Sequence, residues 1–239
     1  MSIIFFEYKV SNKYPPWPPI KKTIINTINP HSFCVAKRDK YFKEALLNSD
    51  ILVPDGIGIV LACRLVLGVK IDRITGAEMH NYLLKEAEKN KLKVFYLGAT
   101  KNTLGKISKK ISEEHPNITF ASFSPKFKPT FTEQENLEMV KIINQFSPDI
   151  LFVGMTAPKQ EKWSYINKEN LNATIIASVG AVFDFYSGNI KRAPKWTMKI
   201  GMEWLYRFFR EPKRMWKRYF INNAKFIYFV LKATLKQRT

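Results

Sequence analysis

The chain has 239 residues, of which 14% are aromatic and 25% are charged, a composition typical of a folded protein with a substantial core. Its two cysteines, Cys34 and Cys63, exclude a disulfide framework and a cysteine-based metal site, and they fit a reducing compartment. We find no signal-peptide pattern and no uncharged apolar run long enough to span a membrane, so we expect a cytoplasmic protein without a transmembrane anchor.

The formal net charge of +19 is unevenly distributed along the chain. From Lys191 to Thr239 there are 14 Lys and Arg residues against two Glu residues, whereas the preceding 190 residues hold 25 basic and 18 acidic residues. Such a basic C-terminal segment indicates a polyanionic partner, which could be nucleic acid, an anionic membrane face or a phosphorylated substrate.

Short apolar runs, mostly of β-branched residues, alternate with segments of helical periodicity. The predicted strands are Lys22–Thr27, Ile51–Val53, Lys93–Leu97, Ile118–Ala121, Ile150–Val153 and Thr174–Val179. The predicted helices between them are Ser32–Asn48, Ile57–Leu67, Ala77–Asn90, Thr103–His115, Thr132–Phe146 and Pro158–Asn170. This alternation predicts an α/β fold with a Rossmann-like, doubly wound and mostly parallel sheet.

The last fifty residues depart from this alternation. Lys195–Arg210 and Pro212–Leu235 are predicted to form two helices, and Pro212 suits the first turn of the second. We therefore divide the chain into an α/β core, residues 1–194, and a basic, aromatic-rich helical appendage, residues 195–239. Aromatic residues of the appendage, such as Trp216 and Tyr228, could insert into a membrane interface or pack on protein.

Small polar or glycine-rich loops follow the predicted strands, at the sheet edge where open parallel sheets bind ligands. The residues in these loops are Thr27 and Asn29, Asp55, Gly98, Gln160 and Asp184. Each of these loops leads toward a helix N-terminus, which favours an anion such as a diphosphate. Together the loops predict a nucleotide-like ligand.

The residues alone leave several alternatives open. Asp55, in Pro54-Asp-Gly56, is either an ordinary turn residue or a reactive base. Arg73 is either a surface ion pair or a stabiliser of a phosphorylated leaving group. Leu61 stands where a dinucleotide fingerprint requires glycine, and the chain has no P-loop and no Asp-x-Asp pair for a divalent metal. We expect the three histidines to be structural or solvated.

Six motifs, in this order, resemble the WecG/TagA/CpsF family of bacterial glycosyltransferases: VPDGIGIV, DRITGAE, FYLGAT, VGMTAPKQEKW, VGAVFDFYSGNIKRAPKW and GMEWLYRFFREPKRMWKRY. The resemblance implies an inverting, metal-independent transfer of a sugar from a UDP-sugar to a saccharide on undecaprenyl diphosphate, with no cofactor. The sugar would be N-acetylmannosamine or a related hexose or uronic acid. The product would serve teichoic acid, common antigen or capsule.

The resemblance also implies roles for individual residues. Asp55 would be the general base. Donor-binding residues would be Thr27, Asn29, Arg73, Gly98, Gln160 and Asp184. Residues of the appendage that meet the acceptor or its diphosphate would be Arg207, Arg214 and Lys217. Lys217 stands where the family often has arginine, and lysine keeps the charge but lacks the planar fork.

The implied partners are a UDP-sugar, a lipid-linked saccharide and the anionic inner face of the plasma membrane, on which the protein would be peripheral. A homo-oligomer is left open. The main alternative is a nucleotide-cofactor enzyme of similar fold, either a dehydrogenase or a methyltransferase. Nucleic acid is not expected as a partner, because the sequence contains no recognised nucleic-acid-binding module.

Overall fold

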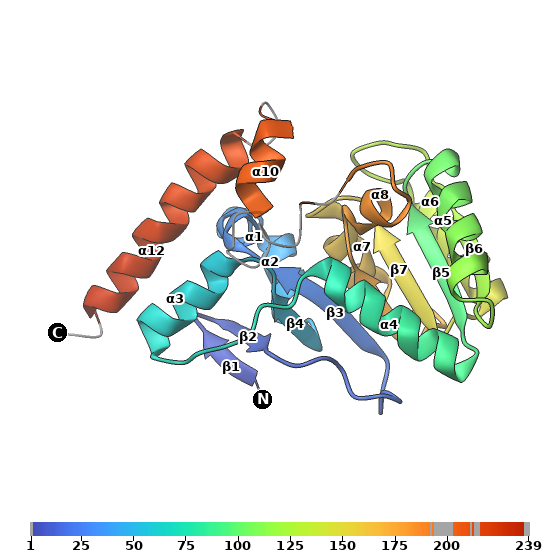
Figure 1. Ribbon diagram of the computed structural model, residues 1–239, viewed down its shortest axis with the longest axis horizontal. Helices are drawn as coiled ribbons and strands as arrows, with labels where there is room; N and C mark the ends of the chain where they lie inside the picture. The colour runs from blue at the N-terminus through green and yellow to red at the C-terminus, as the bar shows by residue number, and fades with distance from the viewer. Residues whose placement is uncertain (1, 192, 194–202, 211, 213–215, 237–239) are drawn as a thin grey trace.

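The computed structural model describes residues 2–191, 193, 203–210, 212 and 216–236. One eight-stranded sheet, of order β1-β2-β4-β3-β8-β7-β5-β6, runs through the molecule (Figure 1). Its strands are β1 (Ser2–Phe5), β2 (Tyr8–Ser11), β3 (Thr23–Ile28), β4 (Ile51–Pro54), β5 (Lys93–Gly98), β6 (Thr119–Phe123), β7 (Ile150–Gly154) and β8 (Ile175–Ser178). Only β1 and β2 pair antiparallel, so the sheet is mostly parallel and the predicted Rossmann-like class is confirmed.

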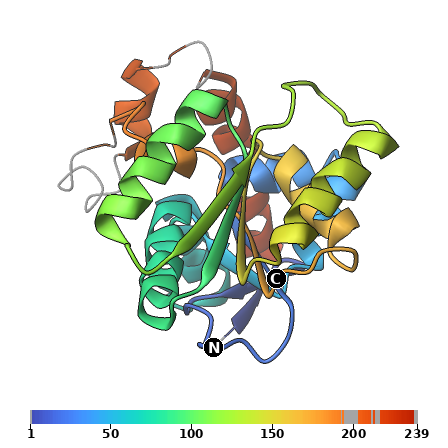
Figure 2. The same ribbon diagram turned by 90° about the vertical axis from the view of Figure 1, so that its right-hand side faces the viewer.

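Helices follow most of the parallel strands. They are α1 (Pro30–Ala36), α2 (Lys40–Leu47), α3 (Ile57–Leu67), α4 (Gly76–Asn90), α5 (Lys101–Glu114), α6 (Glu133–Phe146), α7 (Lys159–Asn167) and α8 (Val182–Tyr186). The C-terminal segments are α10 (Glu203–Arg210), the π-helical turns of η1 (Lys217–Asn222) and α12 (Asn223–Lys236). Figure 2 shows α5 and α6 on opposite sides of the sheet.

The central strands read as continuous apolar runs because both faces of the sheet are covered. Neighbouring residues of one strand enter different cores. Tyr96 packs with residues of α4, α5 and α8 on one face, whereas Phe95 packs with residues of α6 and α7 on the other. A third core, around β2, β4, α1 and α3, also contains Phe226 and Val230 of α12.

The sequence analysis made one wrong prediction within the core and missed one element. The first is the expected helix Ser32–Asn48, which is two helices, because Asp39 adopts an extended backbone and its Oδ1 accepts a hydrogen bond from Phe42 N at 3.0 Å. Asp39 therefore caps α2 rather than continuing α1. The second is the N-terminal hairpin of β1 and β2, which was not predicted and which extends the sheet beyond β4.

The C-terminal helix α12 packs against α1 and α3. Buried Asn222, at the end of η1, fixes this contact, since its Oδ1 accepts from Arg38 Nη2 at 3.1 Å and its Nδ2 lies 2.7 Å from His31 Nδ1. The predicted helix Lys195–Arg210 begins outside the described residues, and the predicted helix Pro212–Leu235 contains the π-helical turns of η1. Within the described parts of the chain, no helix has the length and hydropathy needed to cross a bilayer.

Candidate active site

The loops after β3 and β4 meet at the carboxyl edge of the sheet. The two strands pair in parallel with Ile28 opposite Pro54, which places Asn29 and Asp55 at the same edge. Asp55 N donates to Ile28 O at 2.8 Å, so the backbone of Asp55 is held against the end of β3. Asp55 is only half-buried. A half-buried carboxylate on a fixed loop has the access that a general base needs.

Glycines shape the turn that carries Asp55. Gly56 has a φ of 101°, a conformation that strains other residues, and it leads directly into α3. At Gly58 an added Cβ would lie 2.6 Å from Pro30 Cγ, so glycine allows the first turns of α1 and α3 to touch. The Asp55 loop therefore lies next to the point where the N-termini of α1 and α3 are in contact.

The segment that contains Arg73 joins the same edge. Ile74 N donates to Pro54 O at 3.0 Å, which ties the residue after Arg73 to the residue before Asp55. Thr75 then caps α4 through a capping box with Glu78. The structure thus brings the backbone of the Arg73 segment and the N-terminus of α4 to the sheet edge that carries Asp55. A guanidinium and the first amides of a helix both favour an anion.

Close backbone packing links the end of β3 to the end of β8. A Cβ at Gly76, the first residue of α4, would lie 3.5 Å from Val179 O and 3.9 Å from Thr27 Cγ2. Thr27 is half-buried at this junction. Asn29 also serves α1, since its Oδ1 accepts from Ser32 N at 3.0 Å and caps the helix. Asn29 therefore has a structural role as the N-cap of α1.

Gln160 and Glu161 form a buried pair at the start of α7. Gln160 Nε2 donates to Glu161 Oε1 at 2.9 Å, and Gln160 lies beside Gly180, which follows β8. Burial raises the pKa of Glu161 to about 7. Within the described residues, Gln160 Oε1 and Glu161 Oε2 are buried without a hydrogen-bond partner. The sequence analysis identified Gln160 as a site residue but missed Glu161. A Glu next to a Lys, here Lys162, is typical of an exposed charged surface.

Gly98 and Asp184 lie on the other side of β8. Gly98 has a φ of 121°, and a Cβ there would collide with the Gly154 carbonyl, so glycine is required by the backbone itself. At Gly154 a Cβ would run into the Phe183 ring, which packs α8 tightly onto the ends of β5 and β7. Asp184 follows in α8 and is half-buried, and its backbone oxygen accepts from Ile190 N at 3.1 Å.

The predicted appendage contacts fall outside the side chains that the structure describes. Arg214 lies outside the described residues, as do the side chains of Arg207 in α10 and Lys217 at the start of η1. The core histidine His80 is structural, as expected. It is fully buried, its Nε2 lies 2.6 Å from Tyr96 Oη, and burial lowers its pKa to about 3, so the imidazole is neutral.

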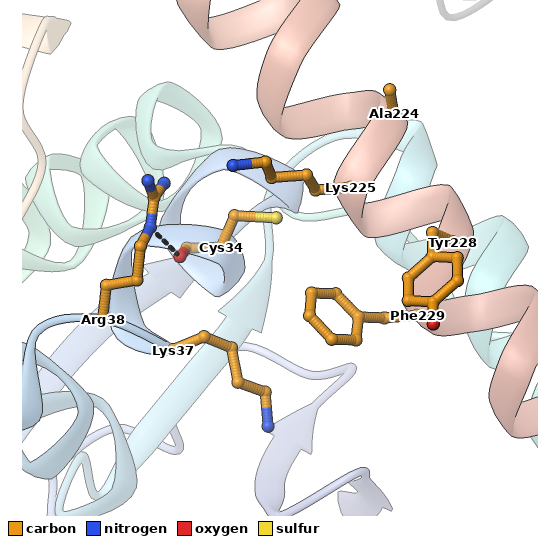
Figure 3. A pocket seen from close by; sticks show the side chains of 7 residues that line it. All are labelled: Cys34, Lys37, Arg38, Ala224, Lys225, Tyr228 and Phe229. Carbon is orange, nitrogen blue, oxygen red and sulfur yellow. Dashed lines mark hydrogen bonds between the residues drawn. The ribbon is translucent and has the colours of Figure 1, made fainter.

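A hollow of about 480 Å³ lies away from the sheet edge, between α1 and α12 (Figure 3). It is lined by Cys34, Lys37, Arg38, Ala224, Lys225, Tyr228 and Phe229. None of the predicted catalytic or donor-binding residues lines it. Burial raises the pKa of the Cys34 thiol, which argues against a reactive thiolate there.

Comparison with known proteins matches this chain to one family over most of its length. The family model for the glycosyl transferase WecG/TagA/CpsF family matches residues 18–239. A Bacillus subtilis (strain 168) relative is 34% identical over 216 residues, covering 90% of this chain and 82% of the relative. A Staphylococcus aureus (strain MW2) relative is 33% identical over 191 residues, covering 80% and 73%. Both are named N-acetylglucosaminyldiphosphoundecaprenol N-acetyl-beta-D-mannosaminyltransferase.

Proposed function

Since this chain belongs to the WecG/TagA/CpsF family of glycosyltransferases, we propose that it transfers N-acetylmannosamine from a UDP-sugar to N-acetylglucosaminyl diphosphoundecaprenol. The donor and acceptor are those that the names of its relatives indicate, with UDP as the expected carrier. The family assignment does not favour the alternative of a dehydrogenase or methyltransferase.

One observation carries the proposal. Hydrogen bonds from Asp55 N to Ile28 O and from Ile74 N to Pro54 O bring the loops of Asn29, Asp55 and Arg73 to one edge of the sheet. This edge also receives the N-terminus of α4. A carboxylate beside a cationic, amide-rich anion site is the arrangement that transfer from a sugar diphosphate requires.

The proposed reaction is a single in-line displacement. The acceptor hydroxyl attacks the anomeric carbon as Asp55 takes its proton, a new glycosidic C–O bond forms, and the bond from that carbon to the UDP oxygen breaks. UDP leaves with the electron pair, and its added charge is stabilised by Arg73 and the first amides of α4. General-base catalysis of this kind contributes a factor of ~10²–10⁴. We propose that the reaction needs no metal ion, because cationic side chains and helix amides can supply the stabilising charge.

We further propose that the protein works as a peripheral protein on the anionic inner membrane face, where its acceptor is embedded. The basic segment after Lys191 supports this, since a Lys or Arg near such a surface contributes roughly 1 kcal/mol of attraction. Arg207, Arg214 and Lys217 would meet the acceptor diphosphate.

The test is a product assay. The full-length protein is incubated with a panel of UDP-sugars and a short-chain lipid-diphosphate-GlcNAc, and products are identified by mass. The expected result is addition of one N-acetylhexosamine from UDP-N-acetylmannosamine, at a rate that EDTA does not change. A product formed only from another UDP-sugar would reject the proposed donor. Activity that EDTA abolishes and Mg²⁺ restores would reject the metal-free reaction.

A further inference from the structure

The outward face of α3 is apolar, which is unusual for a helix at the surface of a protein. Ile57, Leu61 and Leu65 follow one another at intervals of four residues and are 39%, 51% and 62% exposed. The inner face of the same helix, with Ile59 and Cys63, is fully buried. A surface helix normally places polar residues on the side away from the core.

Helix α12, which packs against α3, presents a second stripe of the same kind. Ile227, Leu231 and Leu235 recur every four residues, and each is more than half exposed. Figure 1 shows α3 and α12 together at one end of the molecule, beyond β4. We call the exposed apolar residues of the two helices the α3–α12 face: Ile57, Leu61, Leu65, Ile227, Leu231 and Leu235.

The charges on these helices have a single sign. The segments Ile57–Lys70 and Asn223–Lys236 contain five Lys and Arg residues and no Asp or Glu. The hollow between α1 and α12 is lined by Lys225, by a further cation, Arg38, and by Lys37, whose charge is paired with Glu7 at 3.1 Å (Figure 3). Apolar residues flanked by cations are the pattern of helices that lie in the interface of an anionic bilayer. Two copies of this face would instead bring like charges together.

The α3–α12 face also has a fixed relation to the candidate base. Helix α3 begins two residues after Asp55, and its first turn is held by the contact of Gly58 with Pro30 and by Phe226 of α12. Whatever surface α3 rests on therefore sets the height of Asp55 above that surface.

We propose that the α3–α12 face docks on an anionic lipid bilayer, with the leucines of α3 inserted at the boundary between headgroups and acyl chains. Docking in this way holds the Asp55 loop at the membrane surface, where the diphosphate and sugar of a lipid-linked acceptor lie. The second part rests on the proposed function. The first part, membrane binding through α3, stands on the exposed residues and charges alone.

The test compares two identical substitutions at equal exposure. Leu65→Glu places a carboxylate on the α3–α12 face, and Leu137→Glu places one on α6, where Leu137 is also 62% exposed. Flotation with vesicles of phosphatidylglycerol and phosphatidylcholine measures binding. Leu65→Glu should lower vesicle binding by at least about tenfold, because the variant loses the insertion of an apolar side chain and brings a carboxylate against anionic headgroups. Leu137→Glu should float like the parent protein, and equal flotation of all three proteins would overturn the proposal.

A second assay separates docking from catalysis and folding. With a water-soluble short-chain acceptor, Leu65→Glu should keep the parent rate. With the same acceptor headgroup on a long chain in vesicles, its rate should fall together with its binding. Loss of activity on both acceptors would overturn the proposal, as would a dimer in the parent that Leu65→Glu dissociates. If the parent itself transfers no sugar, the proposed function fails, and flotation still decides whether α3 docks.

Discussion

Helices α3 and α5 cover the sheet at its two ends and show that the fold constrains only the inner face of such a helix. Helix α5 buries Leu104 and Ile107, and its outer face carries Lys109 and Lys110, which lie 3.9 and 3.7 Å from Glu113 and Glu114. Helix α3 buries its inner face equally well, yet its outer face is apolar with one arginine. Because α5 demonstrates that a polar outer face suits this sheet, the apolar outer face of α3 requires a reason outside the fold.

The two ends of the sheet also differ in the candidate site residues that they carry. Asp55 and the turn before α3 belong to the apolar end, whereas the loop after β5 near Gly98 is shaped mainly by backbone packing. We therefore expect the base at the β3–β4 end of the sheet edge, and part of the donor contacts, among them Asp184, at the β7–β8 end.

The assignment predicts different kinetic defects for the same chemical change at the two ends. Asp55→Asn should lower kcat by ~10²–10⁴, because the amide cannot accept the proton of the attacking hydroxyl, while UDP binding persists. Asp184→Asn should mainly raise the KM for the donor, since it removes a contact rather than the base. Steady-state kinetics and calorimetric titration with UDP measure both. Equal kcat for parent and Asp55→Asn would remove the base from the mechanism.

Much of this arrangement could be predicted from the sequence. Helix α3 was predicted at its observed bounds, because Gly56 and Gly68 bracket an apolar run that is interrupted by Arg64 alone. The parallel sheet followed from strand and helix alternation, and a parallel sheet brings Asn29 and Asp55 to one edge. Asp39 was missed as a helix break because the hydrophobic period continues across it. Asn222 and Glu161 were missed because their roles depend on burial by segments far away in the chain.

The C-terminal helix offers a second test, which asks whether α12 contributes to the hydrophobic core at the apolar end of the molecule. Phe226 is 4% exposed and packs against Phe33 and Phe5, with ring centroids 5.3 and 6.4 Å away. Phe226→Ala should lower the free energy of unfolding by about 3–5 kcal/mol, through lost burial and a cavity. Phe209 of α10 is 74% exposed, so Phe209→Ala should change it by less than about 0.5 kcal/mol. Urea denaturation of both variants provides the measurement, and a Phe226→Ala protein as stable as the parent would show that α12 contributes no core.

A smaller effect is expected at α7, which packs against α2 on one side and against β7 and β8 on the other. Burial raises the pKa of Glu161 from 4.5 to about 7, so the folded state holds this proton more tightly than the unfolded state. Stability should therefore fall as pH rises from about 4.5 to 7 and stay lower above that. Glu161→Gln removes this loss of stability. The free energy of unfolding of the variant, compared with that of the parent, should therefore rise by up to about 3 kcal/mol between pH 5 and pH 8.

Glu135 of α6 provides the control of opposite sign. A salt bridge from Lys128 and the capping hydrogen bonds of Thr132 lower the pKa of Glu135 to about 2, so its contribution is present above pH 4.5 and is lost as pH falls toward 2. Glu135→Gln should therefore be less stable than the parent by a constant amount between pH 5 and 8. This difference in the free energy of unfolding should shrink as the pH falls toward 2. Denaturation curves across both windows distinguish the two groups. If Glu161→Gln keeps the parent's loss of stability between pH 5 and 8, another group causes that loss and its assignment to Glu161 is wrong.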